Sequence, residues 1–170
     1  TFTGTYNGDG HTIGNLFIKQ AGASNVRIPT GLFGYTGAEA EICNLALKSV
    51  DVTGCYYVGS LVGNNSGKIS KLSVSGTVTG EWDTGGLVGL NKGTISLTTF
   101  TGAVTGADEI EYGDWTGGLV GYNYGMITRC WVDATVVSKG DNAGGLVGES
   151  LTGGIITESC SAGDVTAYDY

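Results

Sequence analysis

The chain has 170 residues, of which 32 are glycine and one is proline, and its 16 acidic residues against 8 basic ones give a net charge of -8 at pH 7. The composition, 41% hydrophobic and only 14% charged, argues against disorder, and the lack of a glycine at every third position excludes collagen. The acidic balance argues against nucleic acid as a partner, and the apolar runs are too short for membrane insertion.

The first segment carries a triplet of apolar residues, Ile13, Leu16 and Ile18, which we interpret as part of a partial coil. From residue 31 onward a short element similar to Gly-Gly-Leu-Val-Gly recurs five times, with its leucines separated by 29, 26, 32 and 27 residues. Repeats of this length predict a solenoid, because one unit cannot bury its apolar side alone. The leucines are Leu32, Leu61, Leu87, Leu119 and Leu146.

Each leucine is followed by a corner and then by a longer strand. The corners carry Asn or a small polar residue, and stacked Asn amides can bond to the coils above and below. In the strand that follows, Leu72, Val74 and Val78 alternate with Ser73 and Thr77, which is typical of a half-buried strand. We expect one column of corner residues, Thr36, Asn65, Asn91, Asn123 and Ser150, and one of isoleucines, Ile13, Ile42, Ile69, Ile95, Ile127 and Ile156.

These patterns predict an all-β fold, a right-handed parallel β-helix (β-solenoid) with about five full coils of 26–32 residues and an N-terminal partial coil. The chain is one β-solenoid domain, which we interpret as a fragment of a longer chain with flanking domains. Its coils span approximately residues 1–30, 31–58, 59–84, 85–116, 117–143 and 144–170.

The recurring Gly-Gly-Leu-Val-Gly-x-Asn, Gly-x-Ile and Val-Thr-Gly elements resemble the GLUG motif of bacterial surface proteins, over essentially the whole chain. The opening from Phe2 to Leu16 resembles the segment that often begins such arrays. The resemblance implies a stalk or binding module of bacterial adhesins, immunoglobulin-cleaving peptidases and other large extracellular proteins. We therefore expect a rigid spacer or interaction surface at the bacterial cell surface, whose partners are a host or neighbouring-cell surface protein or a glycan.

Groups that perform catalysis are sparse. The sole histidine is His11, and the sequence contains neither a zinc-type His and Cys cluster nor a phosphate loop. We expect no enzyme activity and no cofactor. A non-catalytic segment of a larger peptidase or glycan-active enzyme is a further alternative, because it would have the same sequence features.

Aromatic residues precede the repeat leucine in three successive coils, at Tyr56, Tyr57, Trp82 and Trp115. We place them on one edge, in the variable loop. Exposed aromatic rows can stack on sugar rings or anchor a partner, so the alternative function is a carbohydrate-binding module that uses Tyr57, Trp82 and Trp115. The other interpretation is that these rings fold over the corner and shield the core.

Two further surfaces allow weaker hypotheses. A column of Thr53, Thr79, Thr105 and Thr166 suggests an ice-binding face, although the adjacent column contains aspartates. The longest loop carries four carboxylates within seven residues, which could hold Ca²⁺ through oxygen ligands or could be solvated charge at a loop tip. The candidate calcium ligands are Asp108, Glu109, Glu111 and Asp114.

The four cysteines, Cys43, Cys55, Cys130 and Cys160, show neither CxxC nor metal-type spacing. Cys130 lies on the inward phase of its strand, and Cys160 falls one position later in its repeat, on the outward phase. Side chains that point to opposite faces cannot bridge, so we predict that no disulfide forms.

Overall fold

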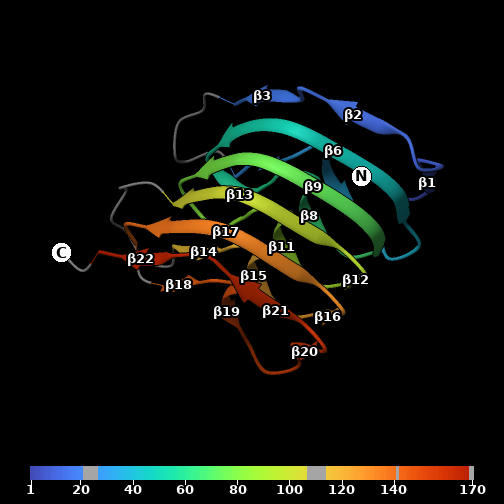
Figure 1. Ribbon diagram of the computed structural model, residues 1–170. Helices are drawn as coiled ribbons and strands as arrows, with labels where there is room; N and C mark the ends of the chain where they lie inside the picture. Colours follow the sequence, from blue (N-terminus) through green and yellow to red (C-terminus); the bar gives the residue numbers. More distant parts are fainter. Residues whose placement is uncertain (21–26, 107–113, 141, 169–170) are drawn as a thin grey trace.

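The computed structural model describes residues 1–20, 27–106, 114–140 and 142–168, and every regular element in these ranges is a β-strand. The strands form three parallel sheets that together make a β-solenoid of about five turns, as the repeats predict. Figure 1 shows the long strands stacked side by side in chain order, with β1–β3 at one end of the stack and β20–β22 toward the other.

We call the 12-stranded sheet the long sheet. It contains β1 (Thr5–Asn7), β2 (Thr12–Gly14), β3 (Phe17–Lys19), β6 (Glu41–Gly54), β9 (Lys68–Gly80), β12 (Thr94–Ser96), β13 (Thr99–Gly106), β16 (Met126–Thr128), β17 (Trp131–Ser138), β20 (Ile155–Thr157), β21 (Cys160–Ala162) and β22 (Val165–Ala167).

Two five-stranded sheets complete each turn. The entry sheet precedes the repeat leucine and contains β4 (Pro29–Thr30), β7 (Tyr56–Gly59), β10 (Thr84–Gly85), β14 (Trp115–Gly117) and β18 (Asn142–Gly144). The corner sheet follows the leucine and contains β5 (Phe33–Thr36), β8 (Val62–Asn65), β11 (Val88–Asn91), β15 (Val120–Asn123) and β19 (Val147–Ser150). The sequence did not predict the entry sheet as a separate element.

The predicted column of repeat leucines is confirmed. The residues that follow the leucines pair in register, from Phe33 with Val62 through Val88 and Val120 to Val147. The leucine backbones also bond from coil to coil, since Leu61 N–H donates to Leu87 O over 3.0 Å and Leu87 N–H to Leu119 O over 2.9 Å. The inner leucines are fully buried, so they form the centre of the core.

The predicted isoleucine column is confirmed for five of its six members, Ile42, Ile69, Ile95, Ile127 and Ile156. The prediction for Ile13 is wrong, because Ile13 pairs with Leu47 and Tyr6 pairs with Ile42 instead. The reason is a bend at Asp9, a residue with positive φ. This bend lies beside the one that Asn44 makes in the next coil. The apolar triplet of the first segment therefore lies one bend further along the long sheet than its spacing suggests.

The corner residues form a continuous hydrogen-bonded ladder, as predicted. Thr36 Oγ1 donates to Asn65 Oδ1 over 2.7 Å, Asn65 Nδ2 to Asn91 Oδ1 over 2.8 Å, and Asn91 Nδ2 to Asn123 Oδ1 over 2.9 Å. Asn123 Nδ2 continues the ladder to Ser150 Oγ over 3.2 Å. The amide of Asn65 also closes its own turn through Gly67, so each asparagine satisfies both its corner and the neighbouring coil.

The glycines of the repeat are explained by the close approach of the entry and corner sheets. A Cβ on Gly89 would lie 2.3 Å from the carbonyl carbon of Tyr57, and one on Gly63 would lie 2.7 Å from the backbone nitrogen of Thr30. Real Cβ contacts do not reach such distances, so the two sheets pack backbone against backbone only where glycine is present. The described residues include no helix of the length and hydropathy that crossing a membrane requires.

Candidate functional site

The predicted aromatic residues lie mostly in strands, which corrects the expectation of a loop. Tyr56 and Tyr57 belong to β7 and Trp115 begins β14, whereas Trp82 lies in the turn before β10. Val58 pairs with Thr84 and Thr84 with Thr116, so the preceding residues Tyr57, Asp83 and Trp115 share one register position. Trp82 precedes this register position by one residue. The position itself therefore holds Asp83 between the aromatic residues Tyr57 and Trp115.

The structure divides the predicted rings between two clusters. Tyr56 packs against Tyr57 with centroids 4.2 Å apart and against Trp82 with centroids 5.9 Å apart. The guanidinium of Arg27 lies 5.1 Å from the Tyr56 ring centroid, within the range of a cation–π contact. Trp115 stacks on Tyr122, with ring centroids 4.3 Å apart and an interplanar angle of 9°. Binding of carbohydrate by Tyr57, Trp82 and Trp115 stays a prediction.

A hollow of about 390 Å³ opens on the outer face of the corner sheet, and we call it the tyrosine hollow. Its walls come from three separate parts of the chain. Tyr57 comes from β7, Leu90 and Lys92 from β11 and the corner after it, and Tyr122 and Tyr124 from β15 and the corner after it. Leu90 is buried at its base, and Tyr124 and Lys92 are exposed. Of the predicted rings, Tyr57 lines this hollow.

Two tyrosines of the hollow, Tyr122 and Tyr124, are linked by their hydroxyls. Tyr124 Oη donates to Tyr122 Oη over 3.1 Å, and their rings meet edge to face with centroids 4.8 Å apart. Burial, together with the hydrogen bond to Tyr124, raises the pKa of Tyr122 well above its ordinary value. Burial and a hydrogen bond with Tyr56 raise the pKa of Tyr57 in the same way. The phenols of Tyr57 and Tyr122 therefore keep their protons and can donate or accept at neutral pH.

Tyr122 and Tyr124 were missed by sequence reasoning because they flank Asn123, a residue assigned to the structural corner. A signal was present in the repeat itself. The residues at the register position of Tyr122 in the other coils are Tyr35, Asn64, Leu90 and Glu149. The repeat therefore does not fix the residue at this position, and the fold does not require a tyrosine there.

Two buried carboxylates lie behind this face. Asp83 is 4% exposed and Asp114 is 7% exposed. Burial, followed by the charges of Asp114 and Glu149, raises the pKa of Asp83 to about 8. The interpretation of Asp114 as a solvated residue at a loop tip is wrong, because Asp114 is buried and packs against Gly140 of the next coil.

The other candidate calcium ligands, Asp108, Glu109 and Glu111, lie outside the described residues. Within the described ranges, no group of three or more His, Cys, Asp or Glu is arranged to hold a metal ion. The calcium site therefore stays a prediction, and Asp114 is not an exposed member of it.

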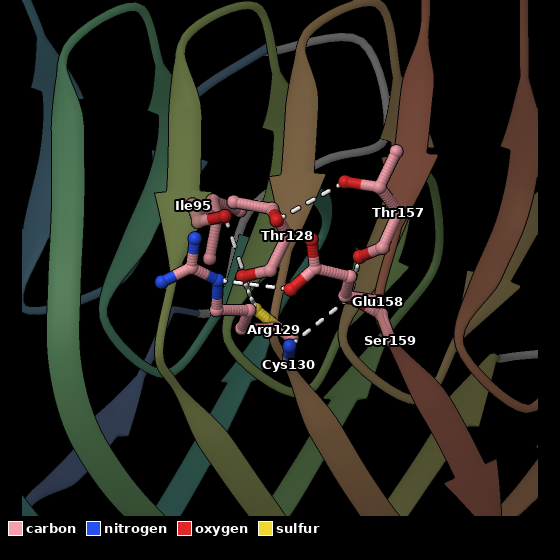
Figure 2. Close-up of polar contacts among 7 residues, drawn as sticks. All are labelled: Ile95, Thr128, Arg129, Cys130, Thr157, Glu158 and Ser159. Carbon is pink, nitrogen blue, oxygen red and sulfur yellow. Dashed lines mark hydrogen bonds and ion pairs between the residues drawn. The ribbon is translucent and has the colours of Figure 1, made fainter.

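The bend in the long sheet carries one non-glycine residue with positive φ in each coil. Asn44, Lys71, Leu97, Arg129 and Glu158 have φ values between 49° and 58°. Figure 2 shows the last two of these bends, where Arg129 Nε contacts Glu158 Oε2 on the next coil at 3.0 Å. Both side chains are exposed, so this ion pair contributes little to stability.

The predicted cysteine phases are confirmed at this bend. Cys130 is buried, and its thiol points inward, with Sγ 3.8 Å from the Ile95 carbonyl oxygen in the preceding coil (Figure 2). Cys160 is exposed and pairs with Trp131, one position out of register with Cys130. Burial raises the pKa of the Cys130 thiol, which keeps it protonated. All four cysteines are free thiols in the structure.

The threonine column exists as predicted, since Thr53 pairs with Thr79 and Thr79 with Thr105. Val137 follows in the next coil and separates Thr105 from Thr166. A regular row of hydroxyls is therefore interrupted on the long sheet, and ice binding stays a prediction.

Comparison with known proteins gives two matches. A family model described as the GLUG motif matches residues 54–79, which run from the end of β6 through the entry and corner sheets and along most of β9. The chain is 43% identical over 77 residues to a protein named halomucin from the archaeon Haloquadratum walsbyi. The match covers 45% of this chain and about 1% of the length of halomucin. No solved structure matches the chain.

Proposed function

We propose that this chain, which matches the GLUG-motif family model over residues 54–79, acts as a rigid spacer or interaction surface of an extracellular protein. The observation that carries the proposal is the continuous parallel pairing of the strands of the entry and corner sheets through five coils. Each coil contacts its neighbours through backbone ladders, buried leucines and the asparagine ladder, so force along the axis acts on many bonds at once.

The last coil exposes apolar side chains on which a further segment of the parent chain can stack. Ile156 is 40% exposed, whereas Ile127, its neighbour in the same column, is 0% exposed. Ile155 and Val165 of the same coil are also exposed. At the other end of the stack, Phe2 and Tyr6 pack on Phe33 with centroid distances of 4.9 and 5.6 Å and cover part of the core. We propose that flanking coils of the parent chain cover the apolar edge of the last coil.

The extracellular location and the partners are proposals of the same kind. The name of the archaeal relative describes a mucin, and it supports a location outside the cell. A surface protein or a glycan of a host or neighbouring cell is the proposed partner of the exposed faces. The proposal assigns no reaction to this chain, and a larger peptidase or glycan-active enzyme that contained it would perform its chemistry elsewhere.

Two experiments test the proposal. Intact cells of the source organism are treated with a protease that does not enter them, and peptides of residues 1–170 are sought in the supernatant. Release only after lysis would contradict the extracellular location. Separately, the chain is pulled from its two ends in a single-molecule force experiment. We expect discrete cooperative unfolding steps, and gradual extension from low force would contradict a rigid spacer.

A further inference from the structure

The tyrosine hollow consists of side chains that the solenoid does not need. The register position of Tyr57 is occupied by Asp83 in the next coil, by Trp115 in the one after and by Asn142 beyond it. The position of Tyr122 is occupied by residues as different as Asn64 and Glu149. Because the same backbone forms with all of these residues, packing of the repeat does not account for the tyrosines.

The hollow combines flat apolar rings with hydrogen-bonding groups at its rim. Tyr124 is 40% exposed although it is a large aromatic residue, and its ring meets Tyr122 edge to face. Leu90 lies at the base, and the exposed Lys92 contributes an ammonium group with three donors. The cavity size of about 390 Å³ lies at the lower end of the range for small-ligand sites.

We propose that the tyrosine hollow binds a neutral hexopyranose unit of a glycan, with the apolar face of the sugar ring against Tyr124 and Tyr57 and its hydroxyls toward Lys92 and the tyrosine hydroxyls. Pyranose rings present C–H groups on one face and hydroxyls around the edge, which matches rings that are flanked by donors and acceptors. The proposal goes beyond the spacer role and does not depend on it.

The charges near the hollow favour a neutral sugar over an acidic one. Glu149 places a negative charge near Tyr122, so the surroundings of the hollow are not positive despite Lys92. A uronic acid would bring a further carboxylate toward Glu149, and like charges repel. In this proposal Lys92 acts as a hydrogen-bond donor to a sugar hydroxyl.

The test measures binding of four purified trisaccharides, namely cellotriose, maltotriose, tri-N-acetylchitotriose and trigalacturonate, to the 170-residue chain by saturation-transfer NMR and calorimetry. We expect at least one neutral trisaccharide to bind and trigalacturonate to bind more weakly than that sugar. Tyr124→Ala should weaken binding by about tenfold or more, which corresponds to the loss of one stacked ring. Tyr124→Phe should retain most of the affinity, because it keeps the ring.

A matched control is available on the same sheet. Tyr35 is exposed and occupies the register position of Tyr122 at the far end of the stack, where it pairs with Asn64. Tyr35→Ala should leave the affinity within about twofold of the parent chain, and melting curves should show that both alanine variants are folded. The proposal is overturned if no neutral trisaccharide binds at millimolar concentration, if trigalacturonate binds most tightly, or if Tyr35→Ala and Tyr124→Ala weaken binding equally.

Discussion

Asn65 donates a hydrogen bond from its side-chain amide to the side-chain carbonyl of Asn91, 2.8 Å away, although 26 residues separate them in the chain. Both residues are fully buried, so neither amide can exchange this bond for one with water. The ladder therefore links the coils at a place where an unpaired polar group would be costly.

Asn91→Ala is expected to destabilise the chain by about 2–3 kcal/mol, because it removes the acceptor of one Asn65 Nδ2 proton and one of the two donors to Asn123 Oδ1, both at buried positions. Chemical denaturation followed by circular dichroism measures the effect. Asn64→Ala is the control, since Asn64 precedes a ladder residue but lies on the partly exposed outer face. Equal losses for the two variants would show that the ladder carries no special stability.

Gly89→Ala is expected to destabilise the chain by about 3 kcal/mol, because its Cβ would lie 2.3 Å from the Tyr57 carbonyl carbon, within a rigid pair of sheets. Gly14→Ala in β2 is the matched control, since a Cβ there meets nothing within 4 Å. Thermal melting of the two variants separates the effect of close approach from the general effect of replacing glycine. A Gly89→Ala variant as stable as the parent would refute the backbone-to-backbone packing of the two sheets.

The main features of the fold could be predicted from the sequence because the repeat leucines, asparagines and isoleucines recur in phase. The entry sheet could not, since strands such as Thr84–Gly85 are too short to show alternation. Ile13 was assigned to the wrong partner because its triplet has the same spacing as that of Ile42. Only the bend at Asp9 distinguishes the two, and a single left-handed aspartate leaves no clear mark in a sequence.

The candidate site could be predicted only in part. Tyr57 was identified as a candidate binding residue, but the hollow depends on Tyr122 and Tyr124, which lie more than sixty residues further along the chain and meet it through stacking. Asp114 was placed at a solvated loop tip because it closes an acidic run. Its burial results from the neighbouring coil, and spacing within one repeat carries no information about that contact.

Leu97→Asn is expected to stabilise the chain by about 0.5–1 kcal/mol. Leu97 adopts φ of 51° and its side chain is exposed, so the backbone is strained without a gain from burial. Asparagine tolerates this conformation better, as Asn44 does at the same bend. Met126→Asn is the control, because Met126 is similarly exposed in β16 but is not among the residues with positive φ. If both substitutions stabilised the chain, the cause would be the replacement of an exposed apolar side chain by a polar one, and not the bend.

The raised pKa of Asp83 predicts that the folded chain loses stability as the pH rises. The ordinary pKa of the carboxyl is 3.8 and its folded value is about 8, so between these values the folded state holds a proton that the unfolded state has released. The contribution of Asp83 is therefore fully present below about pH 4 and is lost progressively up to about pH 8. Each unit of difference corresponds to about 1.4 kcal/mol, so the total change is on the order of a few kcal/mol.

Asp83→Asn is expected to remove most of this dependence, because an amide of similar shape stays neutral at every pH in the window. The variant should melt at a higher temperature than the parent at pH 8 and at nearly the same temperature at pH 4. Asp133→Asn, on the exposed outer face of β17, is the control and should leave the slope of stability against pH unchanged. A variant with the full slope of the parent would show that Asp83 is ionised in the folded chain.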